Sequence, residues 1–305
     1  MQASNSRTLQ QAPNWWGTTR KWLGRVSPRG PREPRIGLAL GGGFARGIAH
    51  VGVLRVFEQH RIPVHAISGV SAGAMVAAAF ASGSNAAEIE VIGRSMKFRD
   101  VARWTISRLG LAGSDRMISF LARLLKVDRF EYMRIPLSVV ATDLCTGKPV
   151  IFNGSGDVVT PIRASCSFPG LFMPLRYQNR YLVDGFVGME VPAEPLRQMG
   201  ATHVISVSIP NAREAVDPTS MFSVVDRCFQ TMSIRLENEW RRHSDVVLEP
   251  DVAEIAWDSF TSAHQLIEAG ERAALAALPT IQKWLAPPEP RKSVAGLRQA
   301  VPQPL

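Results

Sequence analysis

The feature that most constrains this chain is a pair of sharp turns, each at the end of a short apolar run, within residues 36–81. The first run, Ile36–Leu40, is followed by three consecutive glycines, and the second, Val64–Ser68, by Gly-Val-Ser-Ala-Gly. Apolar runs of this length that end in glycine are typical of buried strands in a parallel sheet. We therefore expect both turns at the carboxyl ends of adjacent strands, where open α/β sheets place their binding sites.

The second turn, Gly69-Val70-Ser71-Ala72-Gly73, matches the pattern G-x-S-x-G. In that pattern the serine occupies a strained strand-to-helix turn that exposes its hydroxyl, while Gly69 and Gly73 let the strand and the helix approach closely. A serine at this position can also cap the helix and do nothing more. The apolar run before it and the alanine-rich run after it favour the catalytic interpretation, with Ser71 as the nucleophile.

The first turn, residues 41–47, reads Gly-Gly-Gly-Phe-Ala-Arg-Gly. It lacks the Gly-Lys-Ser/Thr of a phosphate-binding loop, and Arg46 takes the place of the last glycine in a dinucleotide-binding G-x-G-x-x-G. Glycines also let backbone N–H groups face a carbonyl oxygen, as in an oxyanion hole. A tight turn that packs a helix on the sheet is the alternative for any one glycine. The oxyanion-hole residues that we predict are Gly41, Gly42, Gly43, Phe44, Arg46 and Gly47.

The two turns, in this order and this close together, resemble the patatin-like phospholipase family. Three further segments extend the resemblance: Ala-Thr-Asp-Leu at 141–144 with Gly147, Arg-Ala-Ser-Cys-Ser-Phe-Pro-Gly at 163–170, and Leu-Val-Asp-Gly at 182–185. The similarity runs from about residue 35 to about residue 284. It implies a three-layer α/β fold, with a mostly parallel central sheet and helices on both faces.

The resemblance also implies a Ser-Asp dyad without histidine, in which Asp184 accepts the proton of Ser71 and Gly185 completes the turn that carries the base. A carboxylate near its reference pKa of about 4 is a weak base for a hydroxyl. Asp184 must therefore be desolvated or held close to the serine. Taken alone, Asp-Gly is a common turn signal. Phe44 and Phe186 depart from the family pattern, which has small residues there, and either could reshape substrate preference or accompany lost activity.

Other G-x-S-x-G hydrolases order their triad Ser, Asp, His along the chain. His203, His243 and His264 follow Asp184, so chain order alone leaves a triad open. Each is more simply a surface or capping residue, which favours the dyad, and His50 is expected only to pack. The implied function is hydrolysis of lipid esters such as phospholipids or lysophospholipids, without metal or cofactor. Two alternatives stay open: acyl transfer by the same dyad, and a membrane-associated regulatory protein that has lost turnover.

The cysteine content and the apolar segments of the chain indicate its cellular compartment. The three cysteines, Cys145, Cys166 and Cys228, are too few and too scattered for a disulfide framework or a metal cluster. The basic N-terminus is not followed by the apolar segment of a secretory signal, and the most apolar run, residues 66–81, is short for a membrane span. We expect a cytoplasmic protein that contacts the inner membrane face peripherally.

The net charge of +9 is unevenly placed. Residues 1–35 hold seven basic and one acidic side chain, and residues 94–134 hold ten and four, so each stretch carries +6. Apolar side chains recur at helical spacing in residues 15–26 and 115–126, and basic amphipathic helices of this kind bind anionic membranes. The alternatives are a disordered tail for the first and a core helix for the second. We expect a membrane surface as partner rather than nucleic acid.

One domain is expected over residues 35–285, between a basic tail (1–34) and a proline-rich tail (286–305). Strand patterns that alternate with helical patterns predict its parallel sheet. Residues 98–134 are expected to form a basic helical insertion over the strand ends, as a lid or a membrane-facing cap. Residues 171–182 are expected to be a loop that leads back to the strand carrying the base.

Overall fold

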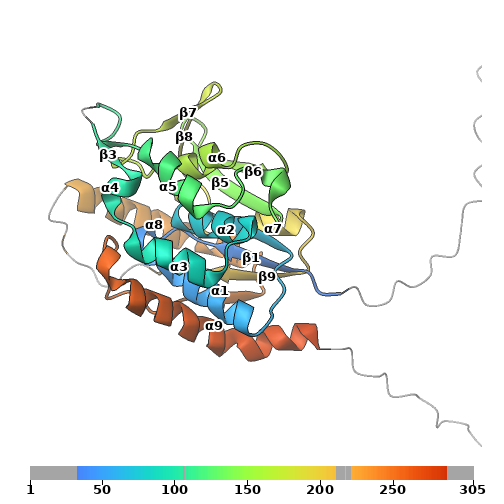
Figure 1. Ribbon diagram of the computed structural model, residues 1–305. Helices are drawn as coiled ribbons and strands as arrows, with labels where there is room; N and C mark the ends of the chain where they lie inside the picture. The colour runs from blue at the N-terminus through green and yellow to red at the C-terminus, as the bar shows by residue number, and fades with distance from the viewer. Residues whose placement is uncertain (1–32, 106, 211–216, 218–220, 287–305) are drawn as a thin grey trace, which may run out of the picture. The chain divides into compact units, whose positions relative to one another are not determined.

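The computed structural model of the chain describes residues 33–105, 107–210, 217 and 221–286 (Figure 1). The described part is built on an eight-stranded sheet in the order β10-β9-β1-β2-β5-β8-β7, with β6 paired to β5 outside that path. The strands of the sheet are β1 (Ile36–Leu40), β2 (Ala66–Gly69), β5 (Leu137–Asp143), β6 (Pro149–Asn153), β7 (Leu175–Tyr177), β8 (Arg180–Asp184), β9 (His203–Val207) and β10 (Val246–Leu248).

Neighbouring strands β10, β9, β1, β2 and β5 run parallel to one another. Strands β6 and β8 are antiparallel to β5, and β7 is antiparallel to β8. Every residue of β1 is buried, as expected for a strand covered on both faces. The predicted α/β fold with a mostly parallel central sheet is confirmed.

Helices cover both faces of the sheet (Figure 1). On one face lie α1 (Ala49–Gln59), α2 (Ala72–Ser82), α3 (Ala86–Ser95) and α9 (Ala263–Leu285), and on the other α7 (Ala193–Gln198) and α8 (Met221–Arg241). The pleat of β1 explains this division. Leu38 and Leu40 join the core under α1, α2 and α9, whereas Ala39 packs with Leu196 of α7 and Trp240 of α8. The short helix α6 (Val159–Ser165) packs against β5 and β8.

Residues 171–182, expected to be a loop, instead contain the hairpin of β7 and β8, and that expectation is wrong. The two strands are joined by a two-residue turn at Gln178-Asn179, and Gln178 has a φ of 53°. Tight hairpin turns need such left-handed backbone, which glycine usually supplies. No glycine marks this turn in the sequence, so the pattern gave no hairpin signal.

The insertion at residues 98–134 is only partly helical, which corrects the prediction. It contains α4 (Phe98–Val101), the two-stranded hairpin of β3 (Arg103–Trp104) and β4 (Ala112–Gly113), α5 (Arg116–Leu124) and the 3-10 helix η2 (Phe130–Tyr132). The backbone before α5 pairs with another segment instead of continuing a helix: the N–H groups of Leu111 and Ala112 both donate to the carbonyl of Leu171, at 3.0 and 2.8 Å.

Helix α5 is a core helix, which was the alternative to a membrane-binding helix for residues 115–126. Its apolar residues Met117, Phe120, Leu121 and Leu124 are each 5% exposed or less, so this face cannot bind a membrane. The membrane-facing interpretation of residues 115–126 is therefore wrong, because the helix packs against α4 and α6. The amphipathic pattern at residues 15–26 and both predicted tails lie outside the described residues, apart from their innermost positions.

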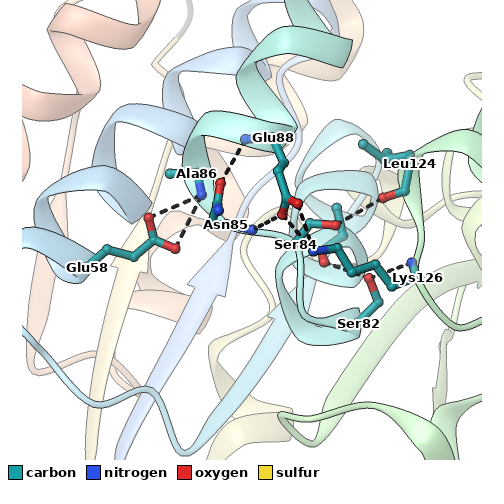
Figure 2. Close-up of polar contacts among 9 residues, drawn as sticks. Glu58, Ser82, Ser84, Asn85, Ala86, Glu88, Leu124 and Lys126 are labelled. Atoms are coloured by element: carbon teal, nitrogen blue, oxygen red, sulfur yellow. Dashed lines mark hydrogen bonds and ion pairs between the residues drawn. The ribbon is translucent and has the colours of Figure 1, made fainter.

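A polar network fixes the start of α3 and joins it to the end of α5 (Figure 2). Asn85 accepts a hydrogen bond from the N–H of Glu88 at 2.8 Å, and the Glu88 carboxylate accepts one from the N–H of Asn85, also at 2.8 Å. This is the reciprocal capping box that satisfies two backbone donors at a helix start. The same carboxylate pairs with Lys126, just beyond α5, at 2.7 Å.

Replacing Asn85 with alanine is expected to lower the free energy of unfolding by about 1 kcal/mol, because the cap of α3 is lost. Urea titration of the variant and of wild type measures the change. Lys126→Ala is the comparison, since an exposed ion pair contributes less than about 1 kcal/mol. Equal stability of Asn85→Ala and wild type would show that the cap does not matter.

Candidate active site

Ser71 sits between β2 and α2 on a strained turn. Its φ of 54° and ψ of −124° lie where residues with a side chain are rare. The flanking residues must be glycines because other backbone atoms come too close to leave room for a Cβ. A Cβ at Gly69 would stand 2.5 Å from the Cα of Ala74, and one at Gly73 would overlap the carbonyl oxygens of Leu40 and Gly41. The elbow thus has the backbone that the G-x-S-x-G pattern predicts, and the N-terminus of α2 points at the serine.

Sheet register brings Asp184 beside this elbow. Gly69 of β2 pairs with Val139 of β5, and Ala141 of β5 pairs with Asp184, the last residue of β8. The Oγ of Ser71 donates a hydrogen bond to the Oδ2 of Asp184 at 2.7 Å. Residues 113 positions apart in the chain are therefore in direct contact.

The other carboxylate oxygen of Asp184 is held by the next turn, the 3-10 helix η3 (Gly185–Val187). Its Oδ1 accepts a hydrogen bond from the N–H of Phe186 at 2.9 Å. A Cβ at Gly185 would overlap the carbonyl oxygen of Val140, so this turn must carry glycine. Asp184 is 1% exposed, and this burial raises its pKa from 3.8 to about 7, although the bonds from Phe186 and Ser71 oppose the rise. A carboxylate with that pKa is a competent base near neutral pH.

Ser165, the last residue of α6, and Ser167 just beyond it hold the pair in place, and the sequence assigned them no role of their own. The hydroxyl of Ser165 accepts the N–H of Ser71 at 2.8 Å and donates to the carbonyl of Val140 at 2.6 Å. The carbonyl of Ser167 accepts the N–H of Asp184 at 3.0 Å. Cys166, between them, is buried, and burial together with the charge of Asp184 raises the pKa of its thiol. The signal for these residues was the family-like segment 163–170.

Some backbone N–H groups of the glycine-rich loop are bonded within the fold, and others are free, among the described residues, to bind a substrate oxygen. The N–H of Gly41 donates to the carbonyl of Val207 at 2.9 Å, so it extends the sheet and is not an oxyanion donor, which corrects that assignment. The N–H of Gly42 lies 3.4 Å from the carbonyl of Glu190. Within the described ranges, the N–H groups of Gly43 and Phe44 have no hydrogen-bond partner. They are the donors that a carbonyl oxygen bound beside Ser71 could use.

His50 of α1 supports the loop, a role beyond the packing that the sequence indicated. It is fully buried, and its Nε2 lies 2.9 Å from the carbonyl oxygen of Gly41. Since a carbonyl oxygen only accepts, Nε2 carries the hydrogen. Burial lowers the pKa of His50 to about 4, which keeps the ring neutral at physiological pH.

The remaining loop residues anchor the 3-10 helix η1 (Phe44–Ile48). Arg46 is 5% exposed and donates from Nη1 to the carbonyl of Pro210 at 3.1 Å. A Cβ at Gly47 would stand 2.5 Å from the Cβ of Ala72, so this glycine lets η1 pack on α2. Phe44 has a φ of 49°, a conformation that suits the glycine expected there, and its ring packs on Trp257 with 4.7 Å between centroids.

A cavity with an empty volume of about 560 Å³, partly open to solvent, lies over this arrangement. Ser71, Asp184, Gly42, Gly43, Phe44 and Arg46 all line it. Its other walls are mostly aromatic and come from Phe168, Phe186, Phe229 and Trp257, with Gln230. Residues 98–134 are not among the described residues that line this cavity, so a lid formed by them stays a prediction.

The three histidines of the triad alternative have other surroundings. His203 is at the start of β9, opposite Ile36, and so at the far end of the strand from the elbow; its ring lies 4.6 Å from that of Trp284. His243 follows α8, where its Nε2 is 3.3 Å from the Nε of Arg242. His264 is exposed and faces Glu268 at 3.4 Å.

The family model for patatin-like phospholipases matches residues 38–197, which include the glycine-rich loop, the elbow and Asp184. The chain belongs to the patatin-like phospholipase family. Among curated relatives, an uncharacterised NTE-family protein of Mycobacterium tuberculosis is 34% identical over 190 residues, which are 61% of this chain and 52% of that protein. Lysophospholipase NTE1 of Scheffersomyces stipitis is 30% identical over 185 residues, 58% of this chain and 12% of that protein.

The chain therefore spans about half the length of the mycobacterial relative and a small part of the second. Among solved structures, VipD from Legionella pneumophila superimposes with a TM-score of 0.51 at 14% identity, over 82% of this chain and 67% of that one. At this identity the likeness concerns the fold alone. None of the helices in the described residues is both long enough and apolar enough to cross a membrane.

Proposed function

We propose that this member of the family is a serine acyl hydrolase of lipid esters, with Ser71 as nucleophile and Asp184 as base. The observation that carries the proposal is the 2.7 Å hydrogen bond from Ser71 to a buried carboxylate whose pKa is raised to about 7. A surface serine beside a solvated aspartate would offer neither the contact nor the basicity.

In the first half-reaction, the Oγ of Ser71 attacks the ester carbonyl carbon while its proton passes to the Oδ2 of Asp184. The oxyanion that forms is bound by the N–H groups of Gly43 and Phe44 and stabilised by the N-terminus of α2. The tetrahedral intermediate then expels the alcohol, which takes the proton from Asp184. The acyl group stays on Ser71.

In the second half-reaction, water attacks the acyl-enzyme and gives its proton to Asp184. The intermediate collapses, the fatty acid leaves, and the proton returns to Ser71. Asp184 takes a proton from Ser71 in the first half and from water in the second, so it must be unprotonated at the start of each half, and the pKa of about 7 sets the working range.

The aromatic walls of the cavity support a lipid substrate, since apolar side chains with a few convergent polar groups favour an apolar ligand. The family to which the chain belongs is named for phospholipases, and one relative bears the name lysophospholipase. Phospholipids and lysophospholipids are therefore the substrates that we propose.

Covalent trapping tests this proposal directly. An alkyl fluorophosphonate is expected to label wild type once per chain: the Ser71 oxygen bonds to phosphorus, fluoride leaves, and mass spectrometry locates the adduct on Ser71. Fatty-acid release from phosphatidylcholine and lysophosphatidylcholine vesicles measures turnover in parallel. Ser71→Ala is the control. Labelling at a different residue, or the same lipid turnover in Ser71→Ala, would overturn the assignment.

We also propose that the β3–β4 hairpin binds the membrane surface. Its exposed apolar side chains are Trp104 (66% exposed), Leu109 (61%) and Leu111 (50%), beside exposed Arg103 and Arg108. Tryptophan and basic side chains together are typical of a membrane interface. The ring of Trp104 lies 5.3 Å from that of Phe98, which in turn lies 6.3 Å from that of Phe44, so the hairpin is close to the site.

Replacing Trp104, Leu109 and Leu111 together with alanine is expected to weaken binding to anionic vesicles by about tenfold or more, because buried side chains of this size each contribute about 1.5–3 kcal/mol. Vesicle co-sedimentation at two salt concentrations measures it, and binding of wild type should fall with salt. Ile234→Ala, which removes an equally exposed side chain (71%) from α8, is the control. Unchanged binding of the triple variant would contradict the proposal.

A further inference from the structure

A second cavity shares Phe44 as a lining residue with the first. Its empty volume is about 470 Å³, part of it open to solvent, and apolar residues and glycines alone line it among the described residues. Phe44 lines both cavities, and Ala72, which follows Ser71 in the chain, lines the second. The two spaces therefore adjoin beside the nucleophile, with one aromatic ring between them.

Aromatic contacts make Phe44 a partition between the cavities. Its ring centroid is 4.7 Å from that of Trp257, a wall of the first cavity, and 5.8 Å from that of Phe260, a wall of the second. The N–H of Ala45 donates to the carbonyl of Trp257 at 3.2 Å, which ties this aromatic loop to the glycine-rich loop. The backbone of Phe44 stays fixed by these contacts, while its side chain separates the two spaces.

The walls of the second cavity suit an alkyl chain. Met75 and Met96 are half-buried at its border, and methionine adapts its unbranched side chain to an irregular ligand. Ile89 of α3 and Phe120 of α5 form its inner side. No charged side chain lines it in the described residues, so a head group or a sugar would find no partner there, whereas burying methylene groups stabilises by about 0.8 kcal/mol each.

The frame of this cavity is held rigidly, which leaves the partition as its adjustable part. Helices α3 and α5 supply much of the wall, and the network around Asn85, Glu88 and Lys126 joins them (Figure 2). The hydroxyl of Ser84, at the start of α3, also donates to the carbonyl of Leu124 in α5 at 3.4 Å. Since these contacts hold α3 and α5 together, the Phe44 ring is the part of the wall that we expect a ligand to displace.

We propose that this cavity receives the acyl chain of the substrate and that Phe44 decides which chain lengths reach it. The inference rests on the proposed function. With the ester carbonyl at Ser71, a short acyl chain fits in front of the Phe44 ring, and a long one displaces the ring and continues past Ala72 toward Met96. Phe44 is thus a specificity-determining residue as well as an oxyanion donor through its backbone.

Nitrophenyl butyrate and nitrophenyl palmitate test the proposal through the ratio of their kcat/KM values. Phe44→Ala is expected to raise the palmitate-to-butyrate ratio by about tenfold or more, because the partition is gone. Met96→Trp fills the far part of the cavity and is expected to lower the ratio by about tenfold, because only the long acyl chain reaches that far. Phe168→Ala, which opens only the first cavity, is the matched control and should leave the ratio near that of wild type.

Binding of hexadecanol to Ser71→Ala separates this inference from the reaction. Adding Met96→Trp should weaken that binding about tenfold, even if no ester is hydrolysed, in which case the reaction is wrong and the cavity assignment stands. If wild type hydrolyses both esters but Phe44→Ala and Met96→Trp leave the ratio unchanged, the acyl-chain assignment is wrong and the proposed function stands. A ratio that moves only in Phe168→Ala would place the chain along the first cavity and overturn the inference.

Discussion

Replacement of Ser71 by alanine or of Asp184 by asparagine is expected to lower kcat for ester hydrolysis by about 10³-fold or more. Ser71→Ala removes the attacking oxygen. Asp184→Asn keeps the size of the side chain, but its amide cannot take the serine proton. If the two groups act as one unit, as proposed, the double variant should lose little more activity than either single variant.

Nitrophenyl butyrate hydrolysis measures these losses, with phosphatidylcholine vesicles as the second substrate. Ser95→Ala, which removes a serine hydroxyl on the exposed surface of α3, should retain wild-type activity. The alanine variants of His203, His243 and His264 test the histidine alternative. If one of them lost activity while Asp184→Asn kept it, a histidine would be the base.

The pH profile of wild type provides an independent check of the same base. Asp184 is active only when ionised, and its pKa is raised to about 7. Activity should therefore rise with pH and level off above about 7, and fall about tenfold per pH unit below it. A base with the ordinary pKa of an aspartate would give a flat profile down to about pH 4.

The sequence predicted the parts of the molecule that local patterns determine. The strands β1 and β2 and the two turns after them are each encoded within a few consecutive residues. Gly69 is an example, since a Cβ there would meet Gly73 and Ala74, which are close to it in the chain. Local chemistry of this kind is visible without any knowledge of tertiary contacts.

Contacts between residues far apart in the chain produced the features that local sequence patterns could not predict. The contact of Asp184 with Ser71 depends on the register of β2, β5 and β8, and only family resemblance anticipated it. The hydrogen bond that Ser165 accepts from the N–H of Ser71 and the one that His50 donates to the carbonyl of Gly41 likewise join residues that no spacing rule connects.

The helix α5 shows a different limit. Its apolar stripe fitted both a membrane surface and a protein core, because periodicity reports which face is apolar and not what covers it. Packing against α4 and α6 decided for the core. Trp104, Leu109 and Leu111 of the β3–β4 hairpin are exposed instead, in a segment that was expected to belong to a helical insertion.

Asp184→Asn should also make the folded protein more stable at neutral and alkaline pH, although it abolishes the proposed activity. The folded pKa of about 7 is above the unfolded value of 3.8, so between these values the folded state binds more protons than the unfolded state. Stability therefore falls as pH rises through this window. From pH 5 to pH 8, ionising the buried carboxylate should lower the free energy of unfolding of wild type by about 2–3 kcal/mol.

Asp184→Asn has no group to ionise at this position, so its free energy of unfolding should not fall in this way between pH 5 and pH 8. Urea unfolding of both proteins at pH 5 and pH 8 measures it, as the stability of the variant minus that of wild type at each pH. His50, with a pKa lowered to about 4, titrates alike in both proteins and cancels in this difference. A difference that grows by about 2–3 kcal/mol means that the fold holds a buried carboxylate at a cost in stability, as expected of a residue kept as a base. A difference independent of pH would mean that Asp184 is solvated as an ordinary surface aspartate is, and the dyad would lose the basicity on which its chemistry depends.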